Sequence, residues 1–168
     1  RAGVFFTTSV TSRQIAELAT DALAACASVT GALASLREPI EAIAPAVKRA
    51  RLALDKLPAK GAFAQIESDT AISAELQALT EALRKLAEAL AAQAERSRGL
   101  TAMHERAEAL CQRLHDVLDG GAREWVHWYE LFAQGFSLHA TPLDLAPPLR
   151  PLREQSHASW IFTSAPPS

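Results

Sequence analysis

Two groups of cationic side chains have the residue types and spacing that suit binding to phosphate. One is a basic run that begins at Lys48 and the other lies near position 100; they comprise Lys48, Arg49, Arg51, Lys56 and Lys60, then Arg96, Arg98 and Arg106. Neutralising phosphates is the main source of protein affinity for nucleic acid. A simpler explanation competes for each group, because charges on a helix face are usually solvated, and the second group alternates with Glu95, Glu105 and Glu108. Both groups are therefore candidates for binding nucleic acid through a local patch.

Aromatic side chains offer a second kind of contact. Trp125, Trp128 and Tyr129 have rings of the kind that stack on the bases of single strands. They fall in a run with strand-like alternation, which favours burial over stacking.

Histidine spacing argues against a metal site. His104 and His115 are separated by about 16 Å of helical rise, too far to share an ion. His127 and His139 are able to face each other across a predicted hairpin, but no third ligand is evident. We therefore assign no metal ligand.

The chain lacks the residues that phosphoryl transfer requires. Phosphates and magnesium are normally held by a Gly-rich loop ending in Gly-Lys and by an acidic motif such as Asp-Glu-x-His, and neither occurs here. Cys26 and Cys111 are too few for a 4Fe-4S cluster and suit a reducing cytoplasm. We therefore expect no ATPase or helicase activity from this chain alone.

Composition predicts a mainly α-helical domain. The chain has 168 residues, of which 49% are hydrophobic and only 6% aromatic, and Ala and Leu supply most of the apolar content. A net charge of -2 gives no overall attraction to nucleic acid or to an anionic membrane. The most apolar stretch, 15–36, is interrupted by Glu17 and Asp21 and is a poor membrane span.

The first helix has a clear start. Thr11 with Gln14 predicts a capping box that opens a helix. Gly31 is expected to weaken the end of this same helix. One face of this helix carries apolar residues at helical spacing, namely Ile15, Leu18, Ala22 and Cys26.

Prolines divide the next region. A second helical segment is expected over 35–57, with Pro39 in its first turn and Pro45 kinking or dividing it. Few periodic apolar residues follow, so 58–69 is predicted to be a loop or tip.

A heptad pattern then predicts one very long helix. A single a/d register is kept by Leu79, Leu83, Leu86, Leu90, Leu100, Ala107, Cys111, Leu114 and Leu118. Because the register continues past Gly99, we expect a continuous helix over 71–118, roughly 72 Å long. A helical hairpin broken near Gly99 is the alternative, and the polar seam residues in the middle are Gln93, Ser97 and His104.

The pattern changes to period two after Gly120-Gly121. Alternation over 125–132 and again over 136–140 predicts a β-hairpin, linked by three residues that end in a left-handed Gly135. A short helix is expected to start at Pro147-Pro148, and 159–163 reads as a last strand. If they stood alone, these strands would expose unpaired edges. We therefore expect the chain to be a segment of a larger protein that supplies a partner sheet. The predicted fold class is thus a mainly α antiparallel bundle with one very long helix, a small β-hairpin and a terminal strand.

Four short stretches resemble one helicase family. The stretch Thr163-Ser164-Ala165, preceded by Trp160-Ile161-Phe162, looks like the Thr-Ser-Ala-Thr-Leu-Ser motif of the DinG/YoaA branch of XPD-like (Rad3) superfamily 2 iron-sulfur DNA helicases, with Pro166-Pro167 in place of Thr-Leu. The other matches lie in the family's order: Phe5-Phe6 with 10–14 and Leu18, then 95–100 with 105–107, then 125–128 with 136–144. Together the four stretches extend over the whole chain, from just after the DEAH box to the Thr-Ser-Ala motif.

The resemblance implies a place in a helicase motor. Residues 1–10 would be a connector, 11–119 the helical Arch domain, and 120–168 a hairpin and strand of the first motor domain. Thr163, Ser164 and Ala165 would couple ATP hydrolysis to unwinding. The parent would use ATP, magnesium and a 4Fe-4S cluster to move 5′ to 3′ on single-stranded DNA in the cytoplasm, and would serve DNA repair.

Two interpretations of different classes remain at this point. The first is the helicase fragment, with Arg96, Arg98, Arg106, Lys48, Arg49 and Arg51 as candidates for contact with DNA. The second is a helical coiled-coil module for protein interaction or dimerisation, which would use the heptad seam to bind another helix.

Overall fold

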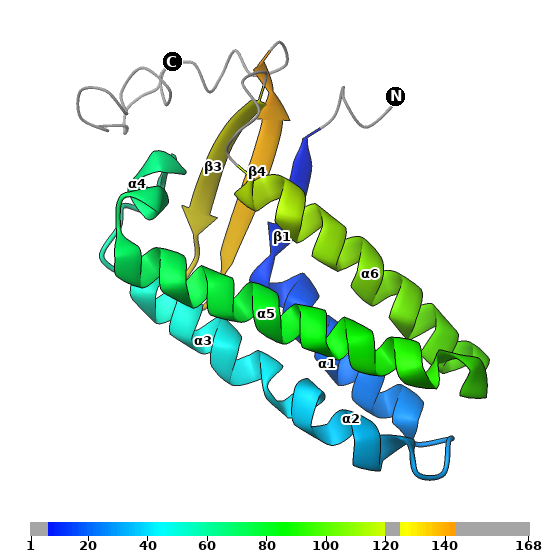
Figure 1. Ribbon diagram of the computed structural model, residues 1–168. Helices are drawn as coiled ribbons and strands as arrows, with labels where there is room; N and C mark the ends of the chain where they lie inside the picture. Colours follow the sequence, from blue (N-terminus) through cyan, green and yellow to red (C-terminus); the bar gives the residue numbers. More distant parts are fainter. Residues whose placement is uncertain (1–6, 120–124, 144–168) are drawn as a thin grey trace.

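A computed structural model describes residues 7–119 and 125–143 of the chain. The predicted apolar run at Val4-Phe5-Phe6, the helix at Pro147-Pro148, the last strand and the Thr163-Ser164-Ala165 motif lie outside the described residues. Helices make up most of the described part and form an elongated bundle with a small antiparallel sheet at one end (Figure 1). The mainly α fold class is therefore confirmed. Within the described ranges, none of the helices combines the length and the apolarity that crossing a bilayer requires.

The first helix begins as predicted. Strand β1 (Thr8–Thr11) runs directly into α1 (Ser12–Cys26). Thr11 Oγ1 accepts a hydrogen bond from the Gln14 amide at 3.0 Å, and Gln14 Oε1 accepts one from the Thr11 amide at 3.0 Å, which is a complete capping box. The apolar face points into the core, where Ile15, Leu18, Ala22 and Cys26 are buried.

The second helical region is divided near Pro45. Helix α2 (Ala32–Glu41) is followed after one residue by α3 (Ile43–Leu54), and Pro45 lies in the first turn of α3. The predicted position of Pro39 was wrong, because α2 begins earlier, after Gly31 adopts the left-handed conformation with φ 83°. Pro39 therefore lies inside α2 rather than in its first turn.

The predicted continuous helix through Gly99 is wrong, and the helical hairpin is what forms. Helix α5 (Thr70–Gln93) ends in a 3₁₀ turn over Ala94–Arg96, and α6 (Arg98–Leu118) returns alongside it (Figure 1). Ser97 between them is extended, with φ −162° and ψ 161°, and its Oγ accepts from the Leu100 amide at 3.0 Å as an N-cap. The polar middle of the seam falls at or just after this turn, where Gln93, Ser97 and His104 are half-buried or at the end of a helix.

The heptad register survives the turn because each half packs against the same core. The seam leucines of α5 are fully buried, and so are Leu100, Ala107 and Leu114 of α6. The long seam is therefore closed inside one chain.

The sheet has more strands than the predicted hairpin. Strands β3 (Trp125–Leu131) and β4 (Phe136–Pro142) form that hairpin, and β1 pairs with β4 while β2 (Lys60–Ala62) pairs with β3, in the order β1-β4-β3-β2. The prediction of a loop over 58–69 was wrong, because this segment contains β2 and α4 (Ala64–Glu67). The hairpin thus finds its neighbours within this chain.

Two close approaches explain glycines near the hairpin. Gly135 is not left-handed as predicted; a Cβ there would lie 2.6 Å from Ser12 Oγ, so the turn needs a residue without a side chain. Gly61 of β2 similarly lies beneath the ring of Tyr129, where a Cβ would be 2.7 Å from the phenol oxygen. The first contact joins the hairpin turn to the start of α1, and the second joins β2 to β3.

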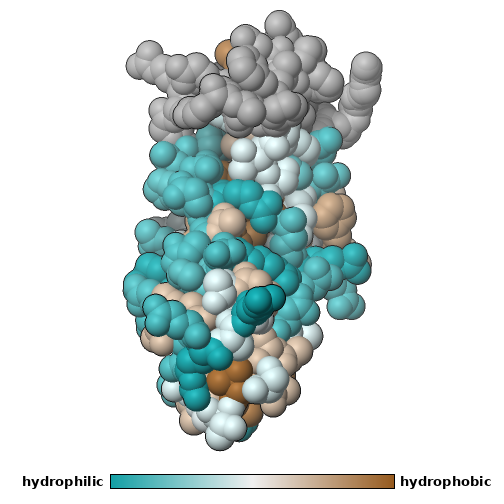
Figure 2. All heavy atoms as spheres, turned by 90° about the vertical axis from the view of Figure 1, so that its right-hand side faces the viewer, coloured by the Kyte–Doolittle hydropathy of each residue, from teal (hydrophilic) through white to brown (hydrophobic). Residues whose placement is uncertain are grey.

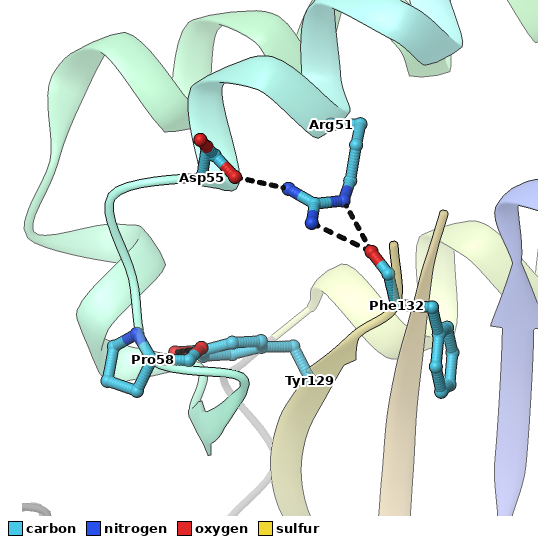
Figure 3. Close-up of polar contacts among 5 residues, drawn as sticks. All are labelled: Arg51, Asp55, Pro58, Tyr129 and Phe132. Carbon is cyan, nitrogen blue, oxygen red and sulfur yellow. Dashed lines mark hydrogen bonds and ion pairs between the residues drawn. The ribbon is translucent and has the colours of Figure 1, made fainter. Parts of the chain in front are cut away.

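The two faces of the sheet differ in character. Tyr129, Phe136 and Leu138 point toward the helices and are at most 1% exposed. The phenol of Tyr129 donates a hydrogen bond to the Pro58 carbonyl at 3.1 Å (Figure 3). The opposite face carries Trp128 and His139, which pair across β3 and β4.

Candidate nucleic-acid interface

The predicted phosphate-binding cations do not converge on one surface. Lys48, Arg49 and Arg51 lie on α3, whose end approaches the sheet. Arg96 ends the 3₁₀ turn after α5 and Arg98 begins α6, at the far end of the bundle (Figure 1). Arg106 lies within α6. The face of the molecule beside α6 is largely hydrophilic (Figure 2).

Arg96 and Arg106 hold the α5–α6 hairpin against α1. Arg96 donates to the Thr30 carbonyl at 2.7 Å and to the Gln93 side chain at 3.0 Å, so it joins the turn to the loop after α1. Arg106 forms an ion pair with Asp21 of α1 at 2.8 Å. Both side chains therefore have structural partners within the chain. Those partners are not the neighbouring glutamates that the sequence suggested.

Arg51 holds the β3–β4 turn. Its Nε and Nη2 donate to the carbonyl oxygen of Phe132 at 3.0 and 2.7 Å, and its Nη1 lies 3.2 Å from Asp55 Oδ1 (Figure 3). Its side chain is only 17% exposed. Arg51 is thus committed to the fold, because a guanidinium has few free donors once two point at one carbonyl.

Lys48 and Arg98 are candidates whose side chains are not used to hold the described part of the fold together. Both are exposed, and within the described ranges neither has a hydrogen bond or ion pair. Arg49 is intermediate, because its contact with Glu75 at 3.6 Å is an exposed ion pair between α3 and α5. Such pairs contribute about 0.2–1 kcal/mol and exchange readily for other anions.

The three aromatic candidates have different surroundings. Tyr129 is fully buried, and Trp125 is partly buried against the core, so packing accounts for both as predicted. Trp128 lies on the other face, where its ring stacks on His139 with centroids 4.0 Å apart and Lys60 Nζ lies 5.0 Å from its centroid. Only Trp128 therefore belongs to a polar surface.

His139 is the centre of that polar face. Its Nδ1 lies 2.6 Å from Ser9 Oγ and its Nε2 lies 2.8 Å from Ser137 Oγ. Burial, assisted by the charge of Lys60, lowers the pKa of His139 to about 4. The imidazole is therefore neutral at pH 7, with both nitrogens hydrogen-bonded.

The predicted pairing of His127 with His139 is wrong. Register places His127 opposite Ala140 and His139 opposite Trp128, so the two rings project from opposite faces of the sheet. His127 Nδ1–H instead donates to the Val117 carbonyl of α6 at 2.9 Å. No group of three or more His, Cys, Asp or Glu side chains in 7–119 and 125–143 is arranged to hold a metal ion.

Sequence reasoning missed a hollow at the sheet end of the bundle. It has a volume of about 560 Å³ and lies between the start of α1, the middle of α3 and the turn of the hairpin. Phe132 in that turn is 50% exposed and lines it. The sequence does place Phe132 beside the predicted turn, but the alternation over 125–132 assigned it to the strand.

Comparison with known proteins finds two similar helicases. Over 165 residues the chain is 27% identical to the ATP-dependent DNA helicase YoaA of Haemophilus influenzae, and over 164 residues it is 28% identical to the ATP-dependent DNA helicase YoaA of Escherichia coli. Each match covers 98% of this chain. The resemblance to the DinG/YoaA branch of helicases is confirmed.

The match covers only part of those helicases. The chain spans 26% of the length of each YoaA relative, about a quarter. No family model matches the chain, and no solved structure matches it. Both cationic groups and the hollow lie inside the stretch shared with YoaA, because so few residues are left outside it.

Proposed function

We propose that this chain is the helical insertion of an ATP-dependent DNA helicase and guides single-stranded DNA past the motor. The observation that carries the proposal is the similarity to YoaA helicases along 98% of the chain. Those relatives are named as ATP-dependent DNA helicases, and the parent of this chain would bind and hydrolyse ATP in the same way.

The path of the chain supports an inserted domain. The bundle begins directly after β1 and returns to the sheet in β3 and β4, and β1 pairs with β4. An insertion needs its two ends side by side, so that the host domain is not disrupted. On this proposal 1–10 is the connector, 11–119 the Arch-like domain and 120–168 part of the motor domain.

Lys48 and Arg98 are the first candidates for contact with DNA. They are exposed cations with no partner in the described ranges, so phosphate contact costs them no existing bond. Arg49 and Arg106 follow, since their exposed ion pairs are exchangeable. Arg51 and Arg96 act as scaffold, because their donors are used on carbonyl groups.

The catalytic machinery belongs to the parent protein. ATP, magnesium and a 4Fe-4S cluster would be held by other segments, and Thr163, Ser164 and Ala165 would couple hydrolysis to movement in the 5′ to 3′ direction. On this proposal the parent would act in the cytoplasm and serve DNA repair, as the family resemblance implies.

The interaction module gains no support from the fold. A coiled-coil partner would need the heptad seam, yet Leu83 and Leu86 at its centre are fully buried within the chain. A second helix cannot reach them without opening the bundle.

The test is an unwinding assay on the protein made from the complete reading frame around this sequence. We expect ATP-dependent separation of a duplex with a 5′ single-stranded tail and not of one with a 3′ tail. Failure to separate either duplex would refute the proposal. Sequencing the reading frame itself checks for the Gly-rich phosphate loop and the acidic motif that this chain lacks.

Variants of that protein test the cations. Lys48→Ala with Arg98→Ala should lower the steepness of the salt dependence of single-strand binding by about 1.4 in log–log slope, since each lost phosphate contact contributes about 0.7. Arg37→Ala is the control, because Arg37 pairs with Glu41 on its own helix. An unchanged slope in the double variant would remove these residues from the DNA path.

A further inference from the structure

The hollow at the sheet end brings together segments that are distant in the sequence. Its walls come from Ser12 and Arg13 at the start of α1, Val47 of α3, and Phe132 and Gln134 of the hairpin turn. Its volume of about 560 Å³ is within the usual range for sites that bind small organic groups.

The turn presents Phe132 as a fixed aromatic surface. The Phe132 amide donates to the Gly135 carbonyl at 2.8 Å, and the Phe132 carbonyl accepts both hydrogen bonds from Arg51. Figure 3 shows its ring directed away from Arg51. Because the backbone is held at both groups, little conformational entropy is lost when something stacks on the half-exposed ring.

The lining suits an anion with a flat apolar part. Val47 and the half-exposed Phe132 supply apolar surface, and Gln134 supplies an amide for hydrogen bonds. Arg13 is the one charged residue among the lining residues of the described hollow, and no carboxylate lines it. Its exposed contact with Glu17 at 3.8 Å is weak enough to exchange for a phosphate.

A second cation follows the lining residue Val47 in the sequence. Lys48 follows the lining residue Val47 on α3 and is exposed without a partner in the described ranges. The hollow thus combines a cation and an exposed aromatic ring, and single strands are held by such groups, with bases stacked and phosphates neutralised.

We propose that this hollow binds one nucleotide of single-stranded DNA, with its base against Phe132 and its phosphate at Arg13. The inference rests on the proposed function, since it names the part of the chain that grips the strand. It differs from the predicted sites, because neither Phe132 nor Arg13 belongs to the cationic groups singled out from the sequence.

The experiment compares two ligands that have the same phosphates. Fluorescence anisotropy of the 168-residue chain is measured with a labelled twelve-nucleotide oligo(dT) and with an abasic strand of equal length. Phe132→Ala should weaken oligo(dT) binding about tenfold and leave the abasic strand unchanged, whereas Phe132→Trp should retain binding. Arg13→Ala should weaken both strands alike. Leu52→Ala is the control, because Leu52 is a 63% exposed apolar residue of α3 that does not line the hollow.

Three results of the binding experiment would overturn the inference. They are equal binding of both strands by the unaltered chain, no binding of either, and a loss in Phe132→Ala that is the same for both strands. A dimer in sedimentation that Phe132→Ala abolishes would instead assign the surface to a second copy of the chain, and would also overturn it. None of these results bears on the helicase proposal, which is tested by the unwinding assay on the longer protein. Failure of one proposal can therefore be distinguished from failure of the other.

Discussion

Acid should destabilise this protein through His139. The imidazole is held neutral between Ser9 and Ser137, with Trp128 stacked on its ring, and its pKa falls to about 4 from an ordinary 6.5. Burial is the larger cause and the charge of Lys60 is the second. Protonation would place a cation in this network beside another cation.

The sign and size follow from proton linkage. Between pH 6.5 and 4 the unfolded chain carries a proton on His139 that the folded chain does not, so the free energy of unfolding falls as the pH falls. The slope reaches at most about 1.4 kcal/mol per pH unit, and the full shift sets an upper bound of about 3 kcal/mol, because the ring is only partly buried and solvent screens part of the interaction. This contribution is complete above pH 6.5 and is lost as the pH drops to 4.

Urea unfolding at several pH values measures this effect. The free energy of unfolding is compared for the unaltered chain and for His139→Asn, which cannot be protonated and retains an amide to pair with Ser9. The variant is less stable at pH 7, because it loses the ring that stacks on Trp128. That deficit should shrink by about 2 kcal/mol between pH 7 and pH 5, since only the unaltered chain loses the linkage term. His115→Asn, at an exposed position on α6, serves as the control.

Parallel pH profiles for the unaltered chain and His139→Asn would refute the reasoning. A proton resonance of His139 that titrates near its ordinary pKa in the folded protein would refute it as well. Either result would mean that water reaches the ring and that the polar face of the sheet is open.

Three further substitutions test packing and local structure by urea unfolding. Leu83→Ala empties a fully buried position in α5 and should cost about 2–5 kcal/mol at every protein concentration; a cost that varies with concentration would instead indicate a dimer. Ser97→Ala removes the N-cap of α6 and should cost about 1 kcal/mol, whereas Ser28→Ala in the exposed loop after α1 should cost little. Gly135→Ala brings a Cβ to 2.6 Å from Ser12 Oγ and should cost about 1–3 kcal/mol, and equal stability would show that the turn shifts freely.

Local features of the sequence were reliable guides where one element carries the whole signal. The capping box at Thr11 and Gln14 satisfies donors within a single turn of helix, so it forms as predicted. The period-two run from Trp125 likewise predicts its strand, because alternation concerns one segment and its two faces. Pro45 divides the helix for a reason that is also local, namely a missing amide hydrogen.

The candidate site was less predictable, because charge type does not reveal the partner. Arg51 and Arg98 look alike in the sequence, yet Arg51 binds a carbonyl on the β3–β4 turn and Arg98 stays exposed. The hollow beside Phe132 needs α1, α3 and the hairpin to meet, and no periodicity in any one of them reports that meeting.

The amino-acid pattern alone thus specified helix faces, a divided helix, a hairpin and the helicase resemblance, since each of these depends on residue types at short range or on motif order. Tertiary structure alone decided that the chain turns back at Ser97 and that β1 and β2 flank the hairpin. A heptad register is equally compatible with one long helix and with two short ones that share a core, so the choice depends on the free energy of packing α6 against α1 and α5. The same packing determines which cations of the described residues remain exposed and which are used in holding the fold together.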